Sequence, residues 1–321
     1  MQDIYMRNTK KKQLIIKKRK SICNPNARKN GIVNNSCFTK KTVNLLKNSY
    51  NIMNPLNKII SNDEREILRE IQQKSSSQCK QDLCLIDKFI KNDRDRSMIK
   101  SLLFVPPKPS EWSKDPDKWL TNFDIMKVLN QYEASYPNFT FIGPSPIDYD
   151  AKEYDKKCVC QKLCKLDKNL KSYLQENPLV KKIGVVFNLD PHTKSGSHWV
   201  SLFIDLEDNF AFYFNSTGQR IPKRINNFTT NVISQCRKMS PLKNIKFHQN
   251  TQMEHQKSNT ECGMYCLYFI ITMLLRQKDI DYNKTRGGQK MTAQDAIKYF
   301  KGSNGRIADK MVFKKRNEYF R

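Results

Sequence analysis

The sequence contains no long apolar segment. Among its 321 residues no window reaches the roughly 18 apolar residues that a membrane-spanning helix needs, and the run "CLYFIITMLL" that begins at Cys266 is too short. The opening "MQDIYMRNTKKKQLIIKKRK" also lacks the apolar stretch of a secretory signal. We therefore expect no membrane span, and a soluble protein in a reducing compartment where its ten cysteines are free thiols.

Acidic residues are scarce beside basic ones. Asp and Glu number 31 against 58 Lys and Arg, which gives a formal net charge of +27. Such an excess favours polyanionic partners, meaning nucleic acid or an acidic surface. Compositional drift in a chain rich in lysine and asparagine explains the charge equally well. DNA association is therefore a hypothesis at this point, and the charge carries no information about the fold.

Composition divides the chain into three regions. Residues 1–35 are basic and poor in large apolar side chains, which predicts a disordered arm. Residues 36–102 carry apolar residues at helical spacing, and Ser61 followed by Glu64 matches a capping box, so we expect a helical N-terminal region. The proline-rich "VPPKPSEW" ends that region, and residues 103–321 form the main domain.

The main domain alternates between helical and strand patterns. A helix is expected over "DPDKWLTNFDIMKVLNQYEASYP", a buried strand from Ile183 to Leu189, and two more strands in "SHWVSLFIDL" and "NFAFYFNSTG". A long apolar helix begins near Cys262. This order predicts an α+β layer architecture, in which a central mixed sheet packs against the apolar helix.

Two of the strands end in polar residues that can meet. His198 lies where a loop feeds one strand, and Asn215 lies where the next strand opens into a turn. If the two strands form an antiparallel hairpin, the start of one lies beside the end of the other, and Asn215 can orient the imidazole. Asp205 is a weaker candidate for that role because it lies near the opposite end of the histidine strand. A lone histidine on a strand is more often structural.

Cys262 is the candidate nucleophile. A helix N-terminus stabilises a thiolate, and a neighbouring imidazolium lowers the thiol pKa further, so the two allow a Cys–His ion pair near neutral pH. Gly263 then leaves room for a substrate backbone. Gln256, six residues before the cysteine, can donate to a developing oxyanion together with the cysteine N–H. Cys266 lies one turn deeper on an apolar face and is expected to be a core residue.

These residues carry a family resemblance. "HWV", followed 17 residues after its histidine by "NS.G" and then by "Q.....CG" at the start of an apolar helix, resembles the Ulp1/adenain-like cysteine peptidases. The segments "GVVFNLDPHTKSGSHWVSLFID", "WLTNFDIMKVLNQYE" and "FTFIGPSPIDY" resemble the branch from large DNA viruses, including African swine fever virus and mimivirus-like giant viruses. The matching segments run from about Trp112 to Arg276, roughly half of the chain.

The resemblance implies a role for each residue of the motif. Cys262 is the nucleophile, His198 the general base that later acts as the acid, Asn215 its orienting group, and Gln256 the donor to the oxyanion. Many cellular members have Asp in the third role, whereas Asn fixes the ring without a charge. The resemblance also implies a papain-like or Ulp1-like core and assigns the cysteine protease catalytic domain to residues 103–321.

Two tryptophans are carried over with the motif. In the SUMO-specific members of the family, tryptophans at such positions wall a narrow tunnel that accepts a Gly-Gly pair before the scissile bond. The resemblance therefore implies that Trp119 and Trp199 bind substrate, and that side chains are rejected sterically. For Trp119, a core aromatic residue on a helix is an equally good interpretation.

A metal site is a weaker interpretation of the cysteines. "CVCQKLC" offers Cys158, Cys160 and Cys164, but it lacks the usual C-x2-C spacing and an evident fourth ligand. "CKQDLC" offers only Cys79 and Cys84. We therefore expect no metal and no required cofactor.

By its resemblance to the viral branch, the chain is expected to cleave viral structural precursors after Gly-Gly-X-like sites during virion maturation. It is then expected in the virion, and in the host cytoplasm during assembly. Two other functions stay open. One is deconjugation of SUMO-like or ubiquitin-like tags by an isopeptidase, and the other is a non-enzymatic, DNA-associated virion protein.

Overall fold

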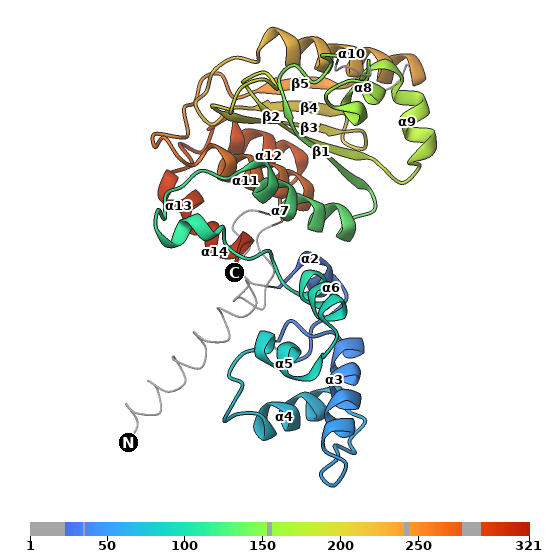
Figure 1. Cartoon of the computed structure of the whole chain (residues 1–321). Coiled ribbons are helices and arrows are strands. Elements are labelled where there is room, and N and C mark those ends of the chain that lie inside the picture. Colours follow the sequence, from blue (N-terminus) through green and yellow to red (C-terminus); the bar gives the residue numbers. More distant parts are fainter. Residues whose placement is uncertain (1–22, 35, 153–155, 241–243, 278–289) are drawn as a thin grey trace. The chain divides into compact units, whose positions relative to one another are not determined.

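The computed structural model describes residues 23–34, 36–152, 156–240, 244–277 and 290–321. These residues form two compact units, one made of residues 23–108 and 317–321 and the other of residues 109–277 and 290–316. The second unit contains every strand that is described (Figure 1).

The first unit is helical. Its helices are α2 (Pro25–Lys29), α3 (Lys40–Met53), α4 (Glu64–Lys74), α5 (Asp82–Phe89) and α6 (Asp93–Leu103). Asp63 caps α4, with its side chain accepting from the N–H groups of Arg65 and Glu66, so the predicted cap at Ser61 is two residues too early. The apolar face predicted for α4 is buried, and its residues are Ile67, Leu68 and Ile71.

The boundaries of the first unit differ from those expected. Cys23 is fully buried and forms a disulfide with Cys37, and α2 follows it, so residues 23–34 belong to the helical core rather than to a disordered arm. The rest of the expected arm, residues 1–22 and 35, lies outside the described residues. At the other end, the backbone of Arg321 hydrogen-bonds to Pro106 and Lys108, which places the last residues of the chain in this unit.

The second unit is built on a five-stranded mixed sheet in the order β1-β2-β3-β4-β5. The strands are β1 (Phe139–Pro146), β2 (Lys182–Asn188), β3 (Trp199–Asp205), β4 (Phe210–Phe214) and β5 (Lys246–Gln249). The two outer pairs are parallel, whereas β2-β3 and β3-β4 are antiparallel. The expected α+β class with a mixed central sheet is confirmed.

Helices cover both faces of this sheet (Figure 1). On one face lie α8 (Gln161–Lys168), α9 (Leu170–Glu176) and α10 (Lys223–Met239), and on the other lie α7 (Asn122–Ser135), α11 (Cys262–Leu275) and α12 (Ala293–Phe300). Alternate residues of a strand point to opposite faces. Leu202 of β3 therefore joins the cluster under α8, α9 and α10, while Phe214 of β4 stacks on Phe269 of α11 at 4.8 Å.

Helix α11 is the central helix of the unit. Its residues from Cys262 to Leu274 are all buried, as expected for a helix that is apolar all round. At 14 residues it is about 21 Å long, shorter than the roughly 30 Å of a bilayer core. Within the described part of the chain, no helix is long and apolar enough to cross a membrane. The short elements η1 (Ser110–Ser113), α13 (Asp309–Lys314) and α14 (Arg316–Tyr319) complete the described structure.

Six of the ten cysteines are paired, which overturns the expectation of free thiols. The disulfides are Cys23–Cys37, Cys79–Cys84 and Cys158–Cys164. Each joins residues that are at most 14 positions apart, and local turns and helix starts bring the Cα atoms of each pair within 6.5 Å. The compartment was inferred from the lack of a signal segment, and that absence carries no information on local pairing.

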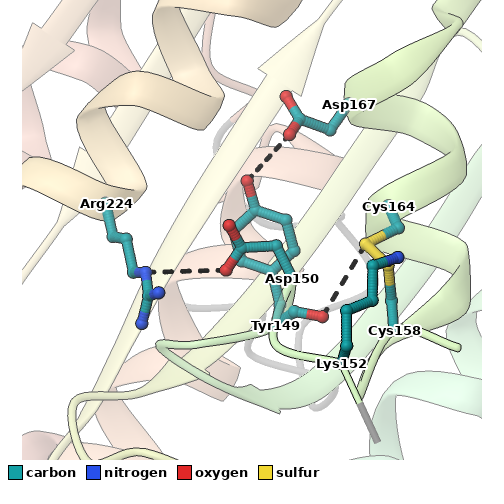
Figure 2. Close-up of a disulfide and its surroundings, with 7 residues drawn as sticks. All are labelled: Tyr149, Asp150, Lys152, Cys158, Cys164, Asp167 and Arg224. Atoms are coloured by element: carbon teal, nitrogen blue, oxygen red, sulfur yellow. Dashed lines mark hydrogen bonds and ion pairs between the residues drawn. A yellow bond between two sulfur atoms is a disulfide. The ribbon is translucent and has the colours of Figure 1, made fainter. Parts of the chain in front are cut away.

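The third disulfide closes the segment that leads into α8 (Figure 2). The Lys152 ammonium lies 3.2 Å from the Cys158 sulfur, and nearby the Tyr149 hydroxyl donates to Asp167 at 2.9 Å. Two of the three cysteines in "CVCQKLC" thus form this disulfide, and of the three only Cys160 keeps a free thiol. Among the described residues, no group of three or more His, Cys, Asp and Glu side chains is arranged to hold a metal ion.

Candidate active site

His198 and Asn215 meet at one edge of the sheet. In the antiparallel register Ser201 pairs with Phe214, so the start of β3 lies beside the end of β4. His198 immediately precedes β3 and Asn215 immediately follows β4, and the His198 Nε2 atom lies 2.9 Å from Asn215 Oδ1. An amide oxygen only accepts, so Nε2 carries the hydrogen and Nδ1 is left with its lone pair. The histidine is therefore in the tautomer that can take a proton through Nδ1.

Asn215 is itself held in place. Its backbone N–H donates to Asn250 Oδ1 at 3.0 Å, and Asn250 Nδ2 donates back to the Asn215 carbonyl at 2.7 Å. The Thr217 hydroxyl and N–H also donate to Asn215 Oδ1, at 2.8 and 3.1 Å. Sequence reasoning missed Asn250, and the only available signal was its position directly after a short strand.

Asp205, the alternative partner for the histidine, has a different role. It ends β3, far from His198 along the strand, and its carboxylate is fully buried. Arg276 forms an ion pair with it, and Lys182 lies 3.8 Å away. The Asp205 carboxylate is thus part of a structural ion-pair cluster. Of the two candidate partners for His198, Asn215 is the one that contacts the imidazole.

Cys262 is the first residue of α11 and is 1 % exposed. Burial raises the pKa of its thiol, and the carboxylate of Glu261 adds to that rise, while the N–H groups of Trp199 and Gly263 favour the thiolate. The contact with the Trp199 N–H places the sulfur beside the residue that follows His198. Burial lowers the pKa of His198, although the bond to Asn215 opposes the change.

These two pKa directions bear on the expected ion pair. A raised thiol pKa and a lowered imidazole pKa both favour the neutral forms. Both directions oppose the Cys–His ion pair that the sequence allows, and that ion pair stays a prediction. Burial is the first cause of both shifts, and for the thiol the N–H donors around the start of α11 act against it.

Gln256 is buried and its side chain has a fixed orientation. Its Oε1 accepts from the Ser216 hydroxyl at 2.7 Å, and its Nε2 donates to the Ser258 carbonyl at 2.6 Å. Its backbone N–H also donates to the Ser216 carbonyl, at 2.8 Å. An amide nitrogen carries two hydrogens, so one donor remains for a substrate oxyanion. Ser216 follows Asn215, and this bond links the Gln256 segment to the histidine edge of the sheet.

Trp119 and Trp199 line one cleft, of about 490 Å³. The Trp199 Nε1 atom donates to the Leu120 carbonyl at 3.1 Å, which ties the two segments together. Trp119 is 40 % exposed and precedes α7, which begins at Asn122. It is therefore a cleft residue rather than the core aromatic that was the alternative interpretation.

Gly263 packs against the wall of the cleft. A Cβ atom there would lie 3.1 Å from Leu120 Cβ and 3.4 Å from Trp199 Cδ1. The glycine thus makes room for the cleft wall to pack against the helix, and the room expected for a substrate backbone stays a prediction. Cys266, one turn deeper, is 1 % exposed, and burial raises the pKa of its thiol well above the usual range. It lies in the core and is unsuited to attack.

Comparisons with known proteins fit this geometry. Residues 146–310 match the Ulp1 protease family, C-terminal catalytic domain. The chain is 30% identical over 217 residues to a thiol protease of Acanthamoeba polyphaga mimivirus, which covers 67% of each protein. It is 27% identical over 270 residues to the SUMO-1 cysteine protease of African swine fever virus, covering 80% of this chain and 89% of the relative.

A solved structure is similar as well. The crystal structure of the African swine fever virus protease superposes with a TM-score of 0.58 at 22% identity, over 94% of this chain and 96% of the other. At that identity the likeness concerns the fold. The matched family segment spans more than half of the chain and contains all four residues of the His–Asn–Gln–Cys motif. The chain therefore belongs to the Ulp1 protease family and is a cysteine protease that hydrolyses peptide bonds.

Proposed function

We propose that the protein is a viral maturation protease that cleaves structural polyprotein precursors after Gly-Gly-X-like sites. The observation that carries the proposal is the cleft that Trp119 and Trp199 line, which lies beside the N-terminus of the nucleophile helix. We infer that the two indoles bound a slot that admits a peptide backbone and rejects larger side chains. The curated relatives named above are proteins of large DNA viruses, which supports the viral setting.

The site residues divide the reaction into two steps. His198 Nδ1 takes the thiol proton as the Cys262 sulfur attacks the scissile carbonyl, and His198 returns that proton to the leaving amine as the C–N bond breaks. Water, deprotonated by the same imidazole, then hydrolyses the thioester. The N–H of Cys262 and the remaining Gln256 Nε2 hydrogen donate to the oxyanion in both steps, and such donors are typically worth about 2.7–4 kcal/mol each.

A peptide panel tests the substrate class. Fluorogenic peptides ending in Gly-Gly-X should be cleaved, while matched Ala-Ala-X peptides should not. Trp119→Ala should reduce the difference in cleavage rate between the two peptide series. Leu179→Ala is the control, because Leu179 is also an exposed apolar residue and lies outside the residues that line the cleft. Equal cleavage of both peptide series would refute the proposal.

A second function has one observation in its favour. The African swine fever virus relative is named a SUMO-1 cysteine protease, so deconjugation of a SUMO-like or ubiquitin-like tag is tested in the same assay. Full-length SUMO-like and ubiquitin-like fusions with a Gly-Gly C-terminus should be cleaved no faster than the peptides. A strong preference for the folded fusions would replace the polyprotein proposal.

The proposal extends to location and to DNA. A protease that matures a particle acts in the host cytoplasm during assembly and is packaged in the virion, so it should co-purify with particles. The formal charge of +27 supports association with packaged DNA, although no cofactor is required for the chemistry. Duplex binding should weaken steeply as salt rises, and weak binding that does not depend on salt would contradict the DNA part.

A further inference from the structure

A buried ion pair lies directly before the nucleophile. Glu261 occupies the N-cap position of α11, and its carboxylate turns to Arg316 from the C-terminal segment of the chain. Arg316 Nη2 donates to Glu261 Oε1 at 2.7 Å and Nε lies 3.3 Å from Oε2, and both side chains are 3 % exposed. This is the two-pronged geometry that a guanidinium makes with a carboxylate.

The same guanidinium holds a second segment. Arg316 donates to the carbonyls of Pro116 and Lys118, at 2.6 and 3.2 Å, and its Nη2 lies 3.4 Å from the Asp117 carbonyl. Its plane lies over the ring of Trp112 at 4.3 Å, and Trp112 Nε1 also donates to the Lys118 carbonyl, at 2.9 Å. The three residues before Trp119 are therefore fixed to the arginine.

Trp119 is thus held from both sides. Lys118 before it is anchored by Arg316 and Trp112, and Leu120 after it is anchored by the Trp199 indole. This explains how an indole that is 40 % exposed can act as a wall of fixed position. The wall and the residue before Cys262 share one arginine.

Fold stability alone gives a weak reason for this arrangement. Burying two charges is costly, and well-packed apolar residues in their place often leave a protein equally or more stable. The carboxylate also lies beside the nucleophile, where a negative charge disfavours a thiolate. The charged and titratable groups that interact electrostatically with Glu261 are Arg316, Asp117, Cys262 and Tyr265.

We propose that Arg316 is a positioning residue that links the nucleophile end of α11 to the Trp119 wall. It neutralises Glu261 beside Cys262, and it fixes the backbone that carries Trp119 at the width that a Gly-Gly substrate needs. The second part rests on the function proposed above, whereas the first depends only on the contacts of Glu261.

The two parts can be separated by four variants. Arg316→Met leaves Glu261 unpaired, so the Cys262 thiol should alkylate more slowly at neutral pH, on the order of tenfold for each unit by which its pKa rises. Glu261→Gln should have the opposite effect, because only the positive charge remains. The double variant should return the alkylation profile towards that of the wild type. Arg316→Lys keeps the positive charge beside Glu261 but loses the two-pronged contact, so of the four variants its alkylation profile should change least.

The substrate side gives the second readout. In Arg316→Met and in the double variant, the carbonyls of residues 116–118 lose the same donors. The KM for the best-cleaved peptide should therefore rise in both, while Glu261→Gln with Arg316 intact should keep the wild-type KM. Alkylation needs no substrate, so its outcome stands even if the Gly-Gly preference fails.

Arg276→Met is the matched control. It breaks a buried ion pair with Asp205 in the same unit, at the end of β3 that lies away from His198. The control should lower Tm and leave the alkylation profile and KM unchanged. If Arg316→Met also lowers Tm without changing either, Arg316 is only structural and the proposal is wrong. If Arg316→Met does not fold, Glu261→Gln and Arg316→Lys decide by the same readouts.

Discussion

Removing the Asn215 side chain should slow catalysis by an amount that the structure sets. In Asn215→Ala, His198 loses its 2.9 Å partner, and the imidazole can rotate or change tautomer. The imidazole becomes charged when it takes the thiol proton, so the bond is then a hydrogen bond to a charged group. A hydrogen bond to a charged group contributes about 1.5–3 kcal/mol. At about 1.36 kcal/mol per tenfold in rate, kcat should fall about 10- to 150-fold.

The assay is steady-state hydrolysis of the best-cleaved peptide, with kcat and KM determined separately. The loss should appear in kcat, because the bond strengthens as the imidazolium forms and not when substrate binds. Thr217→Val is the matched control, since it removes a 2.8 Å donor to the same Asn215 oxygen while the histidine contact stays. We expect the control to change kcat by less than about threefold, the worth of a weak neutral hydrogen bond. A wild-type kcat in Asn215→Ala would refute the assignment.

Two further predictions concern stability. Burial lowers the folded-state pKa of His198, His248 and His255 below 6.5, so the unfolded chain binds protons first and the free energy of unfolding should fall as pH drops below about 6.5. Urea titrations from about pH 8 to pH 5 test this, and a flat profile would contradict it. Replacing Cys158 and Cys164 by serine should destabilise the chain by about 2 kcal/mol, from the entropy of a loop with a sequence separation of 6. An unchanged urea midpoint would show that the disulfide does not stabilise the fold.

Local patterns were sufficient to predict the histidine edge of the site. "SHWVSLFIDL" and "NFAFYFNSTG" are separated by a short polar turn, and consecutive strands joined in that way form an antiparallel hairpin. The register then places His198 beside Asn215 without any long-range information. The start of the apolar helix at Cys262 was readable for the same reason, because polar residues give way there to a continuous apolar run.

Long-range contacts were not predictable from one sequence. Glu261 and Arg316 are 55 residues apart, and nothing in either local segment indicates the other. The pKa shifts of Cys262 and His198 depend on how completely the packed unit excludes water, which spacing does not encode. The boundary predicted for the disordered arm, residue 35, was also too far along the chain. Cys23 is held in the helical unit by a disulfide to a cysteine 14 residues away, which the local sequence does not indicate.

The central claim is that Cys262 is the nucleophile of a cleft that selects Gly-Gly substrates. An electrophilic probe with a Gly-Gly recognition element, followed by mass-spectrometric mapping of the modified residue, tests this most directly. Four cysteines keep free thiols, and Cys160 among them is the more exposed and reports non-selective reaction. We predict label on Cys262, lost in His198→Gln and reduced by a Gly-Gly competitor peptide. Selective label on Cys266 or Cys236, with Cys262 unmodified, would contradict the account.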